Sequence, residues 1–566
     1  MAKPDERVLR PSGFDLGQTL QEALRLHGAG RLREAEKLYT RALKAAPDNF
    51  DALNLLGALK AQSGQMGEAL RLLTSAVKIN PRVPDALFNL ANVLHALKRD
   101  AEALDCLDKA LALNPADPQT LLNRASALLS MKRPQEALAN LDAVLASQPR
   151  NAAALLSRGV ARAGLGRHTE ALDDFNAVIA SAPGNPSALY NRGNTLLQLG
   201  KPAEALTDFD RALAALPEHR LAWNNRGRAL EMLNRHDDAA ASFGKAIALD
   251  KDYADAHFNL ALTLLALGKL DQGFAEYEWR WKRTGVTDRR RDYRRPLWLG
   301  DFPLGRKTIL LYAEQGLGDS IQFARYAPML ANAGARVVLE VQPELKALLG
   351  GLPGIASCHA RGEALPAYDF QCPLGSLPLA LKATSGNVPA PIPYVTADAA
   401  RIDKWRPVIE ALPGKRVALA WAGHVHHIND ANRSIALAAL EPLLAQDGVS
   451  FVSIQHELRA NDAEMLARHG NVTHLGGQFA DMADTAAMMP LVDLVIAVDT
   501  SVAHLAAAMG RPTWVLLPFT PDWRWTLTGE RSPWYPQARL FRQPAIGDWA
   551  SVVANLRDAL AADIKL

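Results

Sequence analysis

Residues 491–517, LVDLVIAVDTSVAHLAAAMGRPTWVLL, contain the side chains best placed for chemistry. An apolar run, Leu494–Val498, stops at Asp499-Thr500-Ser501, and small residues with helical spacing follow over Val502–Met509. A Gly-Arg-Pro turn then leads into a second apolar run, Trp514–Leu517, so this order predicts a strand–helix–strand unit. Hydroxyls and unpaired backbone N–H groups at a helix N-terminus favour phosphate binding. We therefore predict a nucleotide or sugar-phosphate site at this turn, with an ordinary capped turn as the alternative.

The rest of the C-terminal half shows which elements would position this turn. From Lys307 on, apolar runs alternate with Gly-containing turns and helical stretches, one of them over 319–332. The runs expected to form strands are 308–313, 336–341, 417–423, 449–455, 494–498 and 513–518. This alternation predicts parallel sheets covered by helices, in two Rossmann-like lobes at 306–398 and at 399–566, the second ending in a helix. Ligands of such sheets bind at the carboxyl ends of the strands, so we expect a cleft between the lobes.

The first half of the chain repeats itself every 34 residues. Proline recurs at this step from Pro47 to Pro217, and alanine does so from Ala35 to Ala239. A 34-residue period with two helical patterns per unit is the tetratricopeptide signature. We expect seven to eight such repeats over residues 14–283, forming an α-solenoid with a concave groove, after a flexible N-terminus at 1–13.

One further column of the repeat bears on binding. It consists of Asn89, Asn123, Asn191, Asn225 and Asn259, which are separated by multiples of 34 residues. These positions fall in the first helix of each repeat, which lines the groove in this family, and the column resembles the asparagine ladder of nucleocytoplasmic protein O-linked N-acetylglucosamine transferases. Carboxamides can pair with the backbone of an extended peptide whatever its sequence. The alternative is that they satisfy backbone groups between repeats.

Composition excludes several other classes of protein. A net charge of +3 over 566 residues gives no general attraction to nucleic acid, and we expect the aromatic and basic stretch after the repeats to be a capping helix followed by a linker at 284–305. No apolar run of about 18 residues and no secretory signal are present, so we expect neither a membrane span nor export. The three separated cysteines fit buried thiols of a cytoplasmic protein. The histidines at 424, 426 and 427 do not complete a zinc-ligand pattern.

Seven short segments follow one another in the C-terminal half. They are Glu314-Gln315-Gly316-Leu317-Gly318-Asp319, Trp421-Ala422-Gly423, Asn432-Arg433-Ser434-Ile435, Asp484-Thr485-Ala486, Asp499–Ala506, Pro521-Asp522-Trp523-Arg524-Trp525 and Ser532–Pro536. With these segments the chain resembles bacterial glycosyltransferases that carry tetratricopeptide repeats and are related to the heptosyltransferase family. The resemblance spans about residues 307–545. It implies a GT-B fold, inversion at the anomeric carbon, no essential metal or other cofactor, and a nucleotide-sugar donor bound to the second lobe, with the acceptor on the side of the first.

The resemblance also implies roles for individual residues. Asp319, at the start of a helix after a Gly-Leu-Gly turn, matches the Asp proposed as general base, and capping of the helix is its alternative role. The residues expected to bind the donor are Arg433, Gln455, Asp499, Thr500, Ser501 and His504. Further candidates for the pocket are Gln315, Gly318, Trp421, His424, Trp523 and Arg524. Trp523 and Trp525 serve equally well as core residues, and His504 equally well as a buried structural histidine.

Two positions depart from the pattern of the resembling family. His424 stands where the family commonly has Asn, and His456 stands where a Lys often follows the glutamine. Loss of a fixed cation weakens phosphate binding, so a non-catalytic scaffold is one alternative function. A transferase for cell-envelope glycans, with repeats that recruit a secretion or assembly partner, is another. The leading hypothesis is a protein glycosyltransferase whose repeat groove captures a polypeptide. Bacterial enzymes with this layout modify flagellin, which makes flagellin the preferred acceptor by resemblance.

Overall fold

The computed structural model describes residues 15–283, 293–384, 386–388, 392–427 and 429–564. The expected flexible N-terminus at 1–13 and residues 284–292 of the expected linker lie outside this description. The chain divides into two compact units, Met1–Pro217 and Glu218–Leu566. No helix in the described ranges is long and apolar enough to cross a membrane.

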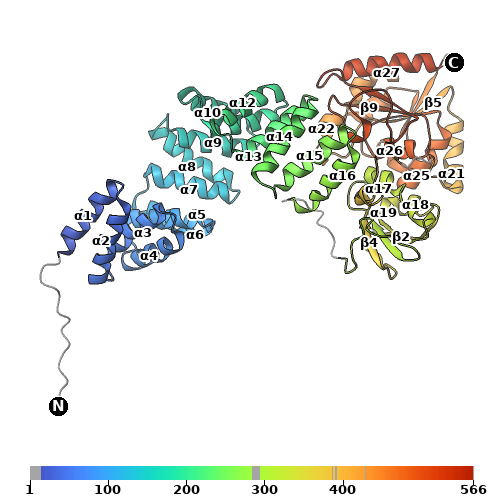
Figure 1. Ribbon diagram of the computed structural model, residues 1–566. Helices are drawn as coiled ribbons and strands as arrows, with labels where there is room; N and C mark the ends of the chain where they lie inside the picture. Colours follow the sequence, from blue (N-terminus) through green and yellow to red (C-terminus); the bar gives the residue numbers. More distant parts are fainter. Residues whose placement is uncertain (1–14, 284–292, 385, 389–391, 428, 565–566) are drawn as a thin grey trace. The chain divides into compact units, whose positions relative to one another are not determined.

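Unit 1 consists of helix pairs that follow one another along the chain (Figure 1, blue to teal). They are α1 (Leu16–Gly28), α2 (Leu32–Ala45), α3 (Phe50–Gln62), α4 (Met66–Ile79), α5 (Pro84–Ala96), α6 (Asp100–Leu113), α7 (Pro118–Ser130), α8 (Pro134–Ser147), α9 (Ala152–Gly164), α10 (His168–Ser181), α11 (Pro186–Gln198) and α12 (Pro202–Ala215). The periodic alanines, such as Ala69 and Ala103, are fully buried. The periodic prolines lie just beyond the second helix, as Pro81 does after α4. Small side chains let the paired helices approach, and proline cannot continue a helix, so the repeat determines both packing and helix length.

Unit 2 begins with two further helix pairs, α13 (Arg220–Met232), α14 (His236–Leu249), α15 (Ala254–Ala266) and α16 (Leu270–Tyr277), before the short η1 (Glu278–Lys282). These helices do not form a domain of their own. Phe274 and Tyr277 of α16 belong to the same hydrophobic core as the strands of both lobes, and the Phe274 ring contacts Phe323 and Trp523 edge-on. The expected boundary at 283 therefore does not separate the two compact units, because the last repeats share their core with the α/β region.

Buried polar contacts also join the end of the repeats to the first lobe. The Arg280 guanidinium donates to Glu278 at 2.6 Å and to Glu314, directly after the first strand, at 3.2 Å. Burial raises the pKa of Glu314 to about 7, and the nearby Arg280 opposes this shift. The Gln315 side chain donates to the Tyr277 hydroxyl at 2.6 Å. The turn that follows the first strand is thus supported from behind by α16 and η1.

The first lobe contains a parallel sheet of four strands with helices beside it. Its strands are β1 (Thr308–Tyr312), β2 (Arg336–Val341), β3 (Ile355–Ala360) and β4 (Phe370–Pro373), in the order β3-β2-β1-β4. Its helices are α17 (Leu317–Ala324), α18 (Ala327–Asn332), α19 (Pro343–Leu349) and α20 (Leu377–Ala380). The single helix expected over 319–332 is two helices, which are interrupted at Arg325-Tyr326, where both side chains are buried.

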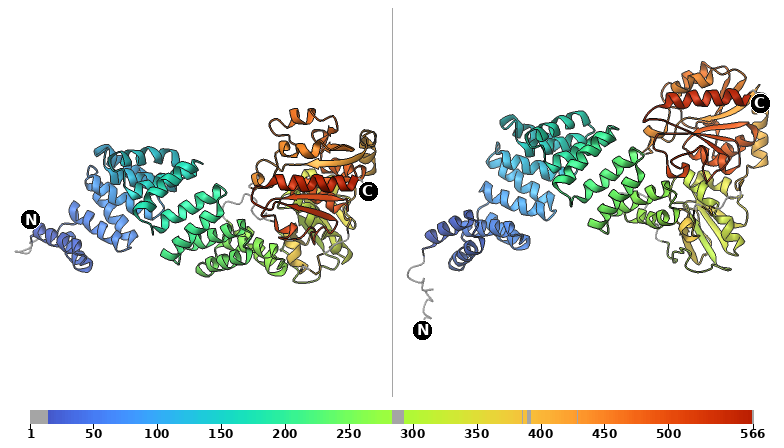
Figure 2. Two further views of the ribbon diagram at one scale, coloured as in Figure 1. Left: turned by 90° about the horizontal axis from the view of Figure 1, so that it is seen from above. Right: turned by 45° about the horizontal axis from the view of Figure 1, so that its top comes forward.

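The second lobe contains a parallel sheet of six strands (Figure 2, orange to red). Its strands are β5 (Lys415–Ala420), β6 (Val449–Ser453), β7 (Val472–His474), β8 (Leu494–Val498), β9 (Thr513–Leu517) and β10 (Ala538–Arg542), in the order β10-β9-β8-β5-β6-β7. Its longer helices are α21 (Ala399–Glu410), α25 (Met482–Met488), α26 (Ser501–Ala508) and α27 (Trp549–Ile564). This is the Rossmann order, whose ligand crevice lies where the connections from neighbouring strands turn in opposite directions, here between β5 and β8.

The expected fold class, helical repeats followed by an α/β region with two parallel sheets, is confirmed. All six expected strands exist, although β5 ends at Ala420 and β6 at Ser453, earlier than expected. Four strands were not expected: β3, β4, β7 and β10. They are short or carry polar residues, and all four lie at the edges of the two sheets, where a continuous apolar run is not required.

Phe274 allows a test of the shared core. Phe274→Ala should lower the unfolding free energy of unit 2 by about 3–5 kcal/mol, because it leaves a cavity where the repeats meet both lobes. All 11 tryptophans lie between Trp223 and Trp549, so tryptophan fluorescence during denaturant unfolding of the full chain reports on unit 2. Phe302→Ala, at a side chain 39% exposed, is the control and should cost much less. Equal small losses for both variants would contradict a shared core.

Candidate active site

The two lobes meet where α17 of the first lobe packs against α26 of the second. Gly318 lies at this contact: a Cβ there would be 2.8 Å from the His504 ring and 3.5 Å from the Ser501 Cα. Only glycine lets the two helix N-termini approach this closely. Beside the contact lies a cavity of about 640 Å³ that both lobes line.

The turn Asp499-Thr500-Ser501, the predicted phosphate turn, forms one wall of this cavity. Thr500 is the extended N-cap residue of α26, but its hydroxyl donates to the Val498 carbonyl at 3.3 Å and does not cap the helix. The backbone N–H groups of Ser501, Val502 and Ala503 consequently have no partner in the part of the chain that the structure describes. Free N–H groups at the positive end of a helix are suited to an anion.

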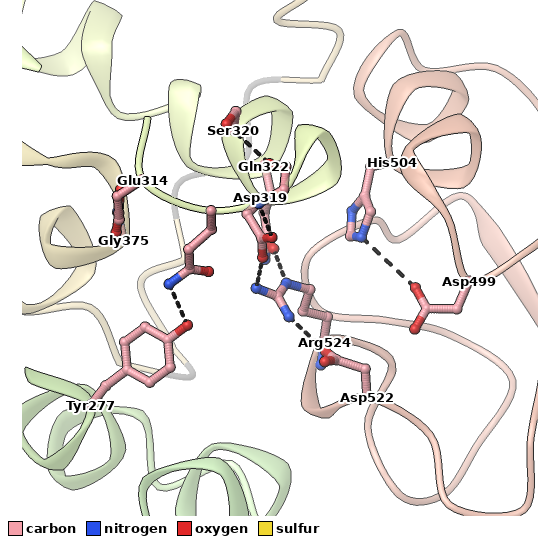
Figure 3. A network of polar contacts seen from close by, with 12 residues as sticks. Tyr277, Glu314, Asp319, Ser320, Gln322, Gly375, Asp499, His504, Asp522 and Arg524 are labelled. Carbon is pink, nitrogen blue, oxygen red and sulfur yellow. Dashed lines mark hydrogen bonds and ion pairs between the residues drawn. The ribbon is translucent and has the colours of Figure 1, made fainter. Parts of the chain in front are cut away.

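Asp319 lines the same cavity from the first lobe, in the first turn of α17. One carboxylate oxygen accepts from the Gly316 N–H at 3.0 Å, and the other accepts from the Arg524 guanidinium. Figure 3 shows Arg524 between Asp319 and Asp522, whose carboxylate it contacts at 2.8 Å. Asp319 therefore bonds the backbone at the start of its helix, as the capping alternative expected, and also presents a carboxylate to the cavity, while its role as general base stays a prediction.

Arg433 provides the second guanidinium of the cavity. It is the last residue of the short helix α22 (Asp430–Arg433), which follows β5, and its Nη1 donates to the Asp499 carbonyl at 3.0 Å. Its guanidinium packs on Gly423, where a Cβ would be 2.6 Å from Nη2. Arg433 thereby connects the loops after β5 and β8 and reaches the cavity beside the phosphate turn.

Burial shifts the pKa values of Asp499 and His504 in the wall that the second lobe contributes. Burial raises the pKa of Asp499 to about 6, and the Asp522 carboxylate acts in the same direction. Burial lowers the pKa of His504 well below its usual range, and Arg524 adds to this effect. The His504 Nδ1 lies 3.0 Å from the Tyr535 hydroxyl, and its Nε2 lies 3.9 Å from Asp499. His504 is therefore a neutral ring held by Tyr535 at the edge of the cavity.

Most of the residues expected in the site line this one cavity. They are Gly318, Asp319, His424, Arg433, Gln455, Asp499, Thr500, Ser501, His504 and Arg524. The Gln455 amide is bonded to the loop after β5. Its Oε1 accepts from the N–H groups of Trp421 and Ala422 at 3.1 and 3.0 Å, and its Nε2 donates to the Ala422 carbonyl at 3.0 Å. The side chain therefore supports this loop, and its expected contact with the donor stays a prediction.

Three candidates do not line the cavity. Gln315 points to Tyr277 instead. Trp421 is fully buried and donates from its indole to Asp462 at 3.1 Å. Trp523 packs edge-on against Phe274 and Trp534 in the core, so the core role weighed for it describes its position.

His424 and His456, the two departures from the family pattern, are both exposed. Both line the cavity, and the His424 ring lies 4.0 Å from Glu457. Over the described residues, no three histidine, cysteine, aspartate or glutamate side chains are grouped to hold a metal ion.

Several residues of the cavity wall had no site role assigned from the sequence. These are Glu344, His427, Asp481, Met482, Thr485 and Asp522. Each lies in a loop or first helical turn beyond the carboxyl end of a strand, such as Glu344 after β2 and Asp522 after β9. The general rule for ligand positions in parallel sheets would have indicated these segments, but not which side chain turns inward.

The asparagine column lies in the first helix of each pair, as expected. Asn89, Asn123 and Asn191 belong to α5, α7 and α11 of unit 1, and Asn225 and Asn259 belong to α13 and α15 of unit 2; all are partly exposed. Several pair with an asparagine of the preceding repeat, as Asn89 does with Asn54 at 3.2 Å and Asn259 with Asn224 at 3.0 Å. The column therefore links neighbouring repeats and keeps exposed carboxamide surface.

The raised pKa of Asp499 predicts a pH-dependent effect on stability. Because the folded protein binds this proton more tightly than the unfolded chain, the wild-type unfolding free energy loses a contribution as pH rises from about 4 to 6. Asp499→Asn removes this loss, so the variant should equal wild type near pH 4 and exceed it by roughly 3 kcal/mol at most above pH 6. Denaturant unfolding at several pH values measures the difference. Asp447→Asn, at an exposed turn, is the control, and a pH-independent gain for Asp499→Asn would contradict the assignment.

Comparison with known families matches both halves of the chain. Models of tetratricopeptide repeats match residues 20–70, 60–120, 122–186, 190–252 and 242–274. The model of glycosyltransferase family 9 (heptosyltransferase) matches residues 438–549, which include the phosphate turn and Arg524.

Individual relatives match parts of the chain. Protein FlbA of Caulobacter vibrioides is 28% identical over 339 residues, and the match covers 55% of this chain and 55% of FlbA. The chain thus spans about half the length of this curated relative. A tetratricopeptide repeat protein from Parabacteroides merdae is 22% identical, with a TM-score of 0.38 over 44% of this chain and 98% of that one. YrrB, described as a TPR protein with an unusual peptide-binding site, is 24% identical, with a TM-score of 0.28 over 32% of this chain and 95% of that one. The chain therefore combines tetratricopeptide repeats with a glycosyltransferase family 9 (heptosyltransferase) domain.

Proposed function

We propose that this chain is a protein glycosyltransferase that moves a sugar from a nucleotide-sugar donor to a side-chain hydroxyl, with inversion and without a metal or other cofactor. The observation that carries the proposal is the cavity between the lobes. There a carboxylate, Asp319, and the unpaired N–H groups at the start of α26 line one space. Transfer of a sugar needs these two groups, a proton acceptor and a site for the departing phosphate.

In the proposed step, the acceptor oxygen attacks the anomeric carbon while the bond from that carbon to the phosphate oxygen breaks. The electron pair of the broken bond leaves with the phosphate, which the N–H groups of Ser501–Ala503 and the guanidinium of Arg433 stabilise. The acceptor proton passes to Asp319. Attack from the first-lobe side and departure toward the second lobe place the two groups on opposite faces of the carbon, which gives inversion.

The repeats supply the reason for proposing a polypeptide acceptor. Partly exposed asparagines in successive first helices offer donors and acceptors to an extended backbone. An enzyme for a small acceptor would have no use for an array of this length. Flagellin is the acceptor that we propose first, on the resemblance of the domain layout. We also place the reaction in the cytoplasm, because three cysteines far apart in the sequence, at 106, 358 and 372, fit a reducing compartment.

A transfer assay tests the proposed roles. Incubation of the full chain with flagellin and CMP-, UDP-, GDP- or ADP-sugars should add the mass of a sugar to flagellin, as read by intact mass spectrometry. Asp319→Asn should slow this by about 10²–10⁴-fold, since it removes the proton acceptor. Ser501→Arg should abolish donor binding, because its side chain fills the phosphate position. Asp447→Asn serves as the control and should remain active. Full activity of Asp319→Asn, or no mass gain with any donor, would contradict the proposal.

Deletion of residues 1–217 tests whether the repeats of unit 1 capture the acceptor. The cut follows the unit boundary and leaves α13–α16, which share the core with both lobes. Transfer to a protein acceptor should fall at least about tenfold through a raised KM, because a large part of the contact with the acceptor is lost. Nucleotide affinity, measured by calorimetry on the same protein, should not change. Undiminished transfer would favour an enzyme for a smaller glycan acceptor.

A further inference from the structure

Arg524 lies between the two lobes at the cavity. It comes from the second lobe, after β9, and its side chain is only 8% exposed. Its Nη1 donates to Asp522 of the same lobe at 2.8 Å, its Nη2 donates to Asp319, and its Nε donates to Gln322 of α17. The face of Trp523 supports the guanidinium at 4.3 Å. One guanidinium thus joins the Asp319 carboxylate to the opposite lobe.

Acidic side chains outnumber arginine and lysine side chains in the described lining of the cavity. Arg433 and Arg524 are the arginines of its described lining, which includes no lysine. The lining also contains the carboxylates of Asp319, Glu344, Glu457, Asp481, Asp499 and Asp522. A donor phosphate must therefore find its cations in a wall with an excess of acid. Arg524 is a fixed cation in this wall, but the carboxylates of Asp319 and Asp522 already bind it.

We propose that the donor phosphate takes the place of Asp319 on Arg524, so that Asp319 is released to accept the acceptor proton only when the donor is in place. This inference rests on the proposed function and adds a positioning residue to it. A carboxylate that shares its oxygens with a guanidinium is a poorer proton acceptor than a free carboxylate. A guanidinium suits the exchange because its planar fork can hold Asp522 through one nitrogen and an anion through the other.

The geometry of the pair supports this exchange. The Asp522 contact and the Trp523 face anchor Arg524 to the second lobe, where the phosphate turn also lies. The contacts with Asp319 and with Gln322 of α17 cross to the first lobe, and of these two partners only Asp319 is charged. Asp319 keeps its bond from the Gly316 N–H at 3.0 Å, so it retains its orientation when the arginine partner changes. Donor binding and the release of the Asp319 carboxylate are then two results of one exchange of anions on the Arg524 guanidinium.

A double-mutant cycle on nucleotide affinity tests the exchange without an acceptor. The probes are UDP, GDP, ADP and CMP, titrated by calorimetry into the full chain, and the tightest binder is used for the cycle. Asp319→Asn should tighten binding about tenfold, because the phosphate no longer competes with a carboxylate for Arg524. Arg524→Met should weaken binding at least tenfold. In the Arg524→Met background, Asp319→Asn should change affinity less than about twofold.

Glu344→Gln is the matched control for the loss of one negative charge. Glu344 also lines the cavity from the first lobe and forms no ion pair with a described residue. It should change affinity less than threefold, and equally in both backgrounds. Arg524→Lys keeps the cation but not the fork, so it should restore part of the affinity, and it replaces Arg524→Met in the cycle if that variant does not fold.

The outcomes separate this inference from the proposed function. If none of the four nucleotides binds the wild-type chain, the proposed function itself fails and this inference falls with it. If a nucleotide binds and Asp319→Asn tightens it equally with and without Arg524, the donor does not exchange with Asp319 and only this inference is overturned. Tightening that depends on Arg524 supports it.

Discussion

The close approach of two helix N-termini, one from each lobe, is the constraint on which the site depends. At Gly318 the start of α17 comes within van der Waals contact of α26, where any side chain would meet His504. This contact brings the Asp319 carboxylate and the unpaired N–H groups of α26 to one cavity. Neither lobe alone combines this carboxylate with these N–H groups.

The same turn is held from its other side by the end of the repeats. Tyr277 contacts Gln315, and Arg280 contacts Glu314, two buried polar contacts directly before the Gly-Leu-Gly turn. Buried charges of this kind are costly unless they are paired, and leaving one partner alone is strongly destabilising. The last repeats therefore belong to the α/β unit both by packing and by electrostatics, and a boundary drawn at the end of the 34-residue period would expose Phe274 and its neighbours.

The repeat period and the apolar runs predicted the helix pairs and the central strands, because both follow from short-range patterns. The edge strands β7 and β10 could not be predicted in the same way, since an edge strand can be short and partly polar. At the site, the loops after β1, β5 and β8 were identifiable from the sequence. What could not be read was the direction of side chains: Gln455 turns back to hold its own loop, Trp421 points into the core, and Asp522 reaches Arg524. Such choices are set by contacts between segments that are distant in sequence.

The pairing of Asp319 with Arg524 also shows why a carboxylate at a helix start is not sufficient evidence of a base. In this structure the carboxylate is oriented by Gly316 and partnered across the lobes. The described wall contains few cations to receive a phosphate. In the proposed exchange, donor recognition and proton transfer are coupled through the few basic groups that this chain places there.

The most direct measurement is a crystal structure of the full chain with a bound product nucleotide. If the proposed site assignment is right, a phosphate oxygen lies about 3 Å from the N–H groups of Ser501–Ala503, with Asp319 facing the same space. A nucleotide bound outside this cavity, or one whose phosphate lies away from the start of α26, would contradict it.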